Sequence, residues 1–343
     1  MFKRFMGIAL GAAALFAQPA MAQTNAIADF YAKKNVDIYV GGAGALELHS
    51  RMIAPYLTKH LPGNPTMVVR AMPGAGGAKA ANFLYSVAPK DGTAIAQLLP
   101  YIAISQAVGS REVQYDSAKY NYIGSIAPIN SVLATWNAST EPKAKTFEDM
   151  KKTEIALGST GRSSITFIGP TIANNYLGTK FKIVSGYPGT APIMLAMERG
   201  ELNGRVADYE GILGPHPDWI EKKLVTLHFH TGLEPDPSLP GVPRLIDLAQ
   251  TAEQKDFMQF VASGSALGRV FVAPPGVPTA RVAALQKAFM DAVNDPEYRK
   301  FLEDRRLLVN PKSGPELLKI VESVLNASPA TIEKAKELFV GDE

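Results

Sequence analysis

Residues 36–44 read VDIYVGGAG, and residues 66–77 read TMVVRAMPGAGG. Each stretch is a strand-like run that breaks into a glycine-rich loop, and a helix-like segment follows each loop. Two such units in tandem place backbone N–H groups at two helix N-termini beside one cleft. That arrangement suits an anion such as a carboxylate or a phosphate. The stretch therefore predicts an α/β fold with an anion site formed by its loops.

Strand-like and helix-like runs alternate along most of the chain, which is typical of the α/β class. Further strands are predicted at residues 93–99, 122–126, 131–136, 155–158, 182–184, 224–230 and 268–273. Helices are predicted at residues 46–59, 78–85, 191–199 and 279–293. Four more are predicted to begin near residues 146, 296, 315 and 329, and another to end near residue 176. The first of these helices should bury Leu48, Met52, Ile53 and Tyr56, and Pro55 should kink or shorten it.

The first 22 residues have the three parts of a secretory signal peptide. Lys3 and Arg4 are followed by an apolar stretch to Phe16, and Ala20-Met21-Ala22 forms a cleavage site. A membrane anchor is the alternative, but the apolar run is too short and Pro19 interrupts its end. The sequence therefore predicts a cleaved signal peptide and a periplasmic mature chain.

Composition excludes several classes of function. The chain has no cysteine, so thiol catalysis, cysteine–zinc sites and iron–sulfur clusters are excluded. Without Lys3 and Arg4, 33 basic residues face 32 acidic ones, which is no electrostatic footprint for nucleic acid. The mature length of ~320 residues suggests two domains.

Catalytic and cofactor motifs are absent from the sequence. It has no G-x-S-x-G, no H-E-x-x-H and no Walker A loop. Residues 42–47 (GAGALE) fall short of a dinucleotide fingerprint, because Glu47 replaces its third glycine. His228 and His230 are predicted on one strand face, where a metal could bind both, but no third ligand is evident. No metal and no cofactor is therefore expected.

Hydroxyl groups cluster where later strands end. Ser159, Thr160, Ser163 and Ser164 surround Arg162, while Tyr187, Thr190 and Asp208 follow other strands. Hydroxyls and backbone amides can hold a carboxylate without reacting with it. Each residue can equally serve as an ordinary helix cap or turn residue. The recurrence of similar loops favours a binding site.

With these residues in view, the sequence resembles the solute receptors of the tripartite tricarboxylate transporter family, the Bug-type periplasmic binding proteins. The resemblance covers nearly the whole mature chain. It rests on PGNPT (62–66), MPGAGG (72–77), AANFLYSVAPKDGT (80–93), GSTG (158–161), LPGVP (239–243) and APPGVP (273–278).

The resemblance implies a two-lobed periplasmic binding protein of type II, a Venus flytrap with its ligand cleft between the lobes. The implied division is a signal peptide (1–22), lobe 1 (23–132 plus 268–343) and lobe 2 (133–267). The implied ligand-binding residues are Gly44, Ala45, Leu46, Gly76, Ser159, Thr160, Ser163, Ser164, Tyr187, Thr190 and Asp208. The implied partners are a small organic acid and transporter membrane subunits, for a monomer that is not an enzyme.

Two departures from the family pattern bear on the ligand. Ala43, Ala45 and Glu47 make the first loop atypical, since alanine disfavours positive φ and limits close backbone approach. Arg162 stands where a small or amide residue is usual, and it either pairs with a second carboxylate or points into solvent. A ligand sensor for a membrane kinase and a periplasmic hydrolase remain alternatives to the transport receptor.

Overall fold

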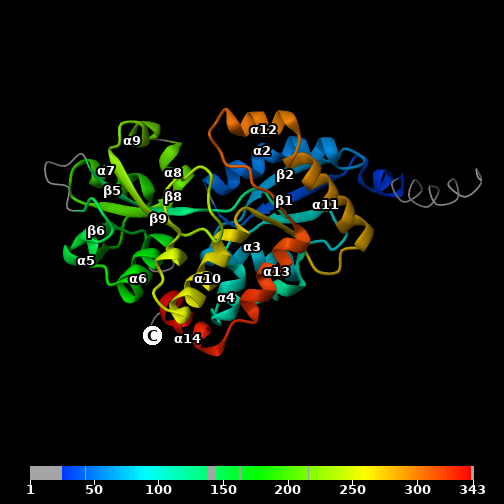
Figure 1. The fold of residues 1–343 in the computed structure, drawn as a ribbon. Helices are drawn as coiled ribbons and strands as arrows, with labels where there is room; N and C mark the ends of the chain where they lie inside the picture. Colours follow the sequence, from blue (N-terminus) through cyan, green and yellow to red (C-terminus); the bar gives the residue numbers. More distant parts are fainter. Residues whose placement is uncertain (1–24, 43, 138–143, 162–163, 215, 341–343) are drawn as a thin grey trace, which may run out of the picture.

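The computed structural model describes residues 25–42, 44–137, 144–161, 164–214 and 216–340. They form two β-sheets with helices on their faces, and Figure 1 shows the sheets side by side. Within these residues, no helix is long and apolar enough to span a bilayer. The predicted signal peptide lies outside the described part of the chain.

The first sheet has six strands in the order β11-β4-β10-β3-β1-β2. Their bounds are β1 Asn35–Val40, β2 Thr66–Ala71, β3 Ala94–Gln97, β4 Asn121–Ser125, β10 Val270–Ala273 and β11 Lys312–Ser313. β1 is parallel to β2 and β3, with Val40 opposite both Ala71 and Gln97. The three strands therefore end together at one edge, where the two glycine loops begin.

The second sheet has five strands in the order β7-β6-β8-β5-β9. Their bounds are β5 Ser131–Trp136, β6 Ile155–Gly158, β7 Phe181–Val184, β8 Gly204–Asp208 and β9 Val225–His230. β6 is parallel to both β7 and β8, whereas β5 is antiparallel to β8 and β9. The loops after β6, β7 and β8 consequently emerge at the same edge.

Helices cover both faces of each sheet. The helices are α2 Ala45–His60, α3 Ala78–Ser86, α4 Ile102–Ala107, α5 Asp149–Lys152, α6 Ile165–Leu177, α7 Thr190–Glu198, α8 Tyr209–Leu213, α9 Pro217–Glu221, α10 Ala252–Leu267, α11 Thr279–Val293, α12 Pro296–Glu303, α13 Gly314–Leu325 and α14 Pro329–Phe339. Fully buried Ile38, Ile53 and Phe289 belong to the core shared by β1, α2 and α11. Ile193 and Met197 of α7 pack in a separate core on the second sheet.

The chain crosses between the sheets twice, and the two crossings are hydrogen-bonded to each other. Residues 126–130 connect β4 to β5, and residues 231–269 connect β9 to β10. The Arg269 N–H donates to the carbonyl oxygen of Ala127 at 3.0 Å, and Arg269 Nη1 donates to that of Pro128 at 3.2 Å. β5 lies wholly in the second sheet, whereas the predicted boundary between residues 132 and 133 passes through this strand. The division itself stays a prediction.

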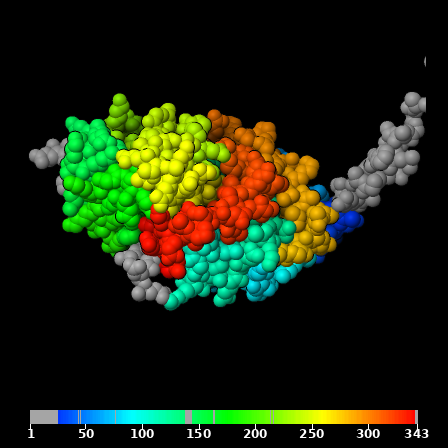
Figure 2. Space-filling model, turned by 60° about the horizontal axis from the view of Figure 1, so that its bottom comes forward, coloured from blue at the N-terminus to red at the C-terminus, as the bar shows by residue number. Residues whose placement is uncertain are grey.

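The C-terminal helix α14 joins the two halves. It packs against α10 and against α6 of the second sheet. Lys334 of α14 forms an ion pair with Glu253 of α10, and Gln254 Nε2 donates to the Tyr176 carbonyl of α6 at 3.0 Å. Figure 2 shows this red segment lying between the green second-sheet half and the rest of the molecule.

Most predicted helix boundaries are confirmed, but the expectations for Leu48 and for the start of α5 are wrong, and Pro55 does not shorten its helix. α11 runs over the predicted 279–293, and Asp295, Ser313 and Ser328 cap the next three helices. Leu48 is 54% exposed, because it lies on the side of α2 away from the sheet. α2 continues through Pro55 to His60 without shortening. α5 begins at Asp149, later than predicted, although the Thr146 hydroxyl accepts from the Asp149 N–H at 3.3 Å as the predicted cap would.

Candidate functional site

The two glycine loops of the first sheet present helix N-termini without side-chain caps. Gly44 (φ 70°) precedes α2, and Gly77 (φ 92°) precedes α3. A Cβ at Gly41 would lie 3.7 Å from the carbonyl oxygens of both Gln97 and Gly77, so the loops are neighbours. Uncapped N–H groups and the helix dipoles favour an anion here. Leu46 is buried under the first loop, and Gly76 lies in the short 3₁₀ turn Ala75–Gly77.

The atypical residues of the first loop are accommodated locally. Ala45 is the first residue of α2 and does not have a positive φ. The positive φ in the first loop belongs to Gly44, and in the second loop Ala75 has a φ of 48°. Glu47 accepts from Arg51 Nη2 at 2.6 Å, one turn later in the same helix. The acidic side chain beside the loop is therefore paired with a cation. Ala43, Arg162 and Ser163 lie outside the described residues.

In the second sheet, the hydroxyl loop after β6 is held by its own side chains. Ser159 is fully buried, and its Oγ accepts from the Gly161 N–H at 3.1 Å. Thr166 Oγ1 accepts from the Thr160 N–H at 3.1 Å, and Ser164 Oγ caps α6 by accepting from the Thr166 N–H at 3.3 Å. These hydroxyls shape the loop. Thr160 and Ser164 stay partly exposed, so they can also face a ligand.

The loop after β7 joins this hydroxyl loop and leads into α7. The Tyr187 N–H donates to the Ser159 carbonyl oxygen at 3.3 Å. Gly189 precedes α7 and offers no side-chain cap, and Thr190, the first residue of the helix, is exposed. The structure thus brings Ser159, Thr160, Tyr187 and Thr190 together at one edge of the second sheet.

A buried charged cluster connects the two edges. His49 of α2 lies with its Nε2 3.3 Å from Glu210 Oε2 of α8. Arg269 Nη2 contacts the same carboxylate and lies 3.5 Å from Asp208 Oδ2. The Leu308 N–H donates to Glu210 Oε1 at 2.8 Å. Because α2 follows β1 and α8 follows β8, this cluster shows that the carboxyl edges of the two sheets face each other.

Burial and pairing set the charges in this cluster. Burial raises the pKa of Asp208 to about 6, although Arg269 opposes the rise. Burial also disfavours charge on Glu210, but the hydrogen bond from His49 and the charge of Arg269 bring its pKa below the usual value. Burial lowers the pKa of His49. At neutral pH this cluster therefore contains a neutral histidine and an ionised Glu210 paired with Arg269.

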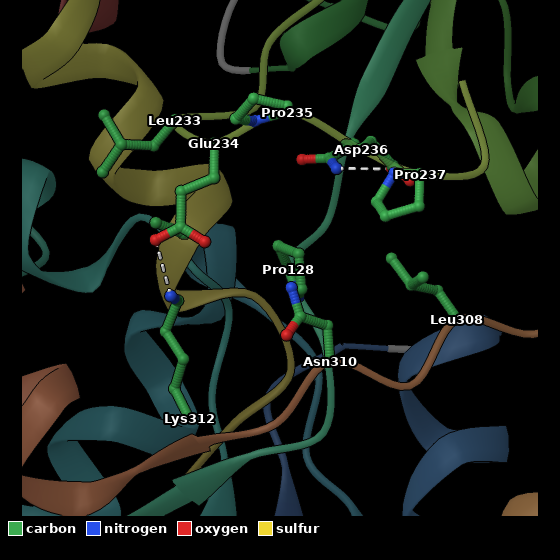
Figure 3. A pocket seen from close by; sticks show the side chains of 11 residues that line it. Pro128, Leu233, Glu234, Pro235, Asp236, Pro237, Leu308, Asn310 and Lys312 are labelled. Atoms are coloured by element: carbon green, nitrogen blue, oxygen red, sulfur yellow. Dashed lines mark hydrogen bonds and ion pairs between the residues drawn. The ribbon is translucent and has the colours of Figure 1, made fainter. Parts of the chain in front are cut away.

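Two cavities lie beside this cluster. Figure 3 shows a small pocket in which Lys312 reaches Glu234. In the same pocket, Asn130 Nδ2 donates to Asp236 Oδ2 at 2.7 Å. An adjoining cavity of about 310 Å³ extends to Asp208 and Glu210. Of the predicted ligand-binding residues, Asp208 alone lines it. The other described ones lie on the two facing edges.

The suggested histidine pair is engaged in other contacts. His228 Nε2 lies 2.7 Å from Thr135 Oγ1, and His230 Nδ1 accepts from the Gly232 N–H at 3.2 Å. No group of three or more His, Asp or Glu side chains in the described part of the chain is placed to hold a metal. These contacts identify both histidines as parts of the second sheet's packing.

His228 predicts a loss of stability in acid. Burial lowers its pKa to about 4, below the unfolded value near 6.5. The stabilisation is thus fully present above about pH 6.5 and is lost as the pH falls towards 4, by about 3 kcal/mol. Urea unfolding between pH 8 and pH 4 should show a steeper decline for the wild type than for His228→Gln. Parallel curves for the two proteins would contradict this assignment.

Sequence reasoning missed His49, Arg205, Glu210 and Arg269. The sequence carried a signal for Arg205, because this charged residue interrupts the otherwise apolar strand GRVA (204–207). The structure buries Arg205 almost completely, which is rare for arginine. His49 and Glu210 had none, since they lie 161 positions apart.

Comparisons with known proteins cover most of the chain. A family model described as "Tripartite tricarboxylate transporter family receptor" matches residues 50–336. The "UPF0065 protein in gbd 5'region" of Cupriavidus necator is 28% identical over 313 residues, which cover 86% of this chain and 85% of the relative.

Solved structures show a similar fold. A TctC solute binding protein from Polaromonas has a TM-score of 0.68 at 16% identity, covering 90% of this chain and 99% of its own. An R. palustris protein with adipate has a TM-score of 0.65 at 18% identity, covering 89% and 98%. The predicted α/β, two-lobed periplasmic-binding-protein fold is confirmed.

Proposed function

We propose a function from one premise: this chain belongs to the tripartite tricarboxylate transporter receptor family. It is a periplasmic receptor that binds a small organic acid and delivers it to the membrane subunits of a tripartite transporter. The chain is exported by the signal peptide 1–22, which is then removed, and it acts as a monomer without turning its ligand over.

One observation carries this proposal. Three helices, α2, α3 and α7, begin behind glycines with no side-chain cap, and they begin at the two sheet edges that face each other across the His49–Glu210 contact. Free N–H groups at facing helix N-termini are suited to carboxylates. The hydroxyls of Thr160, Ser164 and Thr190 add neutral donors.

The two crossings suit a receptor that closes around its ligand. The proposed lobes, 23–132 plus 268–343 and 133–267, are joined where residues 126–130 meet Arg269. A few residues at such a junction can absorb the backbone rotation of a hinge. Closure would bring the uncapped helices of both sheets against one ligand.

The hydrolase alternative lacks an organised base in the described structure. In the described part of the chain, the Ser or Thr hydroxyl that is hydrogen-bonded to a histidine belongs to Thr135. Thr135 is buried with its partner His228 in the second sheet. His49 is buried between the two sheets, and its Nε2 is engaged by Glu210. Binding without chemistry is the reading that these contacts support.

A thermal-shift screen of the purified mature protein tests the proposal. Mono-, di- and tricarboxylates at millimolar concentration, with glucose and chloride at matched ionic strength as controls, should separate acids from other solutes. A bound acid raises the melting temperature, because it stabilises the folded state by mass action. Stabilisation by glucose, with none by any acid, would overturn the carboxylate assignment.

Thr160→Ala should weaken binding of the best acid about fivefold, the effect of one neutral hydrogen bond. Thr171→Ala is a matched control, since its hydroxyl donates to the Phe167 carbonyl within α6. Calorimetric titration of the wild type and both variants measures the change. Equal affinities for all three proteins would remove Thr160 from the site.

A further inference from the structure

We propose that Glu210 is a latch that holds the two halves of the molecule together before a ligand binds. The first half is the first sheet with its helices, and the second half is the second sheet with its helices. The bonds that Glu210 makes to the first half keep the closed arrangement populated and thereby set the affinity for an acid. The inference rests on the proposed function, because a latch matters only in a receptor that opens and closes.

Glu210 belongs to the second half, but its carboxylate is bonded from outside that half. It is the second residue of α8, and the preceding Tyr209 is buried in the core of the second sheet. His49 Nε2 of α2 lies 3.3 Å from its Oε2, and the Leu308 N–H donates to its Oε1 at 2.8 Å. Arg269, which ends a crossing, contacts Oε2. Both carboxylate oxygens are therefore used by groups of the first half and of a crossing.

The segment 304–311 between α12 and β11, here called the strap, is fixed to the first half. Its Asn310 N–H donates to the Ile126 carbonyl oxygen, just after β4, at 3.2 Å. Residues 307–309 pack against the core shared by β1, α2 and α11. If the second half moves away, the strap stays with the first half and its bond to Glu210 must break.

The strap also reaches α9 of the second half. Arg306 Nη1 lies 3.0 Å from Glu221 Oε1, and both side chains are more than half exposed. Arg306 has a φ of 55°, a conformation that disfavours any residue with a side chain. An exposed ion pair contributes little by itself. Together with the buried bonds of Glu210, however, it makes a second polar contact that opening must break.

Polar bonds, more than packed side chains, hold the strap to the start of α8. The cavity of about 310 Å³ is lined by residues 306–308 of the strap and by residues 208–210 of the second half. Closely packed surfaces lose contact over their whole area when they separate, whereas a few polar bonds can be exchanged for bonds to water. This contact can therefore open and form again, as a latch requires.

The latch would affect affinity through the population of the closed form. A ligand that needs the closed form has an apparent dissociation constant equal to its intrinsic constant divided by the closed fraction. A latch that keeps the free protein closed removes this penalty. Weakening the latch therefore raises the apparent dissociation constant, although no contact to the ligand is lost.

The test variant combines His49→Leu with Arg306→Met. It weakens the latch without leaving a buried charge alone, because Glu210 keeps Arg269 and the Leu308 N–H. Small-angle X-ray scattering of the ligand-free mature protein should give a larger radius of gyration for this variant than for the wild type. A saturating acid should bring the two radii together. Calorimetry should show an affinity about tenfold weaker, the effect of a closed fraction that falls to about a tenth.

His60→Leu combined with Lys287→Met is the matched control. His60 is also in α2, and its Nε2 lies 2.8 Å from Asp295 Oδ2, a carboxylate that keeps Lys59 as a partner. Lys287 forms an exposed ion pair with Asp291 within α11. The control therefore loses the same two kinds of bond, but all the partners lie in the first half. Its radius and its affinity should equal those of the wild type.

Three results would overturn the latch. The first is an equal radius for the ligand-free wild type and the test variant, and the second is an equal expansion of the control variant. The third is a weaker affinity with an unchanged radius, which would place His49 in the ligand site itself. Thermal melting followed by circular dichroism confirms that each variant is folded before its radius is compared.

The scattering experiment needs no ligand, so it separates the latch from the proposed function. Expansion of the test variant, with no acid bound by any of the three proteins, would support the latch and defeat the carboxylate receptor. Acid binding by all three proteins, with equal radii and equal affinities, would keep the receptor and overturn the latch.

Discussion

Arg269→Met is expected to lower the free energy of unfolding by about 3–5 kcal/mol. The guanidinium is 2% exposed, and it contacts Glu210, Asp208 and the Pro128 carbonyl oxygen. Removing it leaves the buried Glu210 carboxylate with only the neutral His49 and the Leu308 N–H. The cost is large because a buried charge without its partner keeps the full penalty of desolvation. Urea unfolding at pH 7.5 measures the loss.

Two further variants show whether the loss comes from this cluster. Arg306→Met breaks an exposed ion pair with Glu221 and should cost less than about 1 kcal/mol. Glu210→Gln, added to Arg269→Met, should recover more than about 1 kcal/mol, since residues in contact do not act additively. A double variant whose loss equals the sum of the single losses would show that the two side chains are not coupled.

Gly268→Ala is expected to cost about 3 kcal/mol or more, because backbone strain and a steric clash coincide. Gly268 has φ 56°, and a Cβ there would lie 2.1 Å from the Ala127 carbonyl oxygen. That oxygen belongs to the other crossing and accepts from the Arg269 N–H, so it cannot retreat without breaking a hydrogen bond. Thermal and urea unfolding both report the change.

Gly109→Ala is the control for the backbone term alone. Gly109 also has a positive φ, 70°, but a Cβ there would meet no atom within 4 Å. It should cost about 1 kcal/mol, the usual penalty of a left-handed conformation for alanine. Similar losses of unfolding free energy for Gly268→Ala and Gly109→Ala would mean that the two crossings can move apart to accommodate the added methyl group.

These two largest effects fall at the junction of the sheets, where Gly268 lies in a crossing and Arg269 pairs with Glu210 and Asp208 beside the larger cavity. The junction is buried and satisfied by charges and backbone bonds, whereas Thr190 and Gly44 at the edges are exposed. Variants at the edges should therefore change affinity more than stability. This separation lets the binding experiments be interpreted without large folding effects.

Local patterns predicted much of the fold. Both ends of the 279–293 helix are predicted correctly. Its apolar periodicity and the preceding Pro278 are local signals that involve only residues a few positions apart. The prediction that Leu48 is buried is wrong. Which side of α2 faces the sheet depends on how the helix docks, and apolar periodicity within one helix does not decide which of two neighbouring positions is buried. β10 was recognised as a strand, but its antiparallel place between β3 and β4 needed the three-dimensional structure.

The sequence by itself determined the alternation of strands and helices, the glycine and hydroxyl loops at strand ends, and the resemblance to a receptor family. Those features depend on neighbours within one or two turns of chain. The tertiary structure alone decided that His49 meets Glu210 and that the buried Arg205 donates to the Thr190 carbonyl oxygen at the start of α7. Such facts arise when distant segments pack and exclude water, because only burial makes one charge costly and its partner necessary.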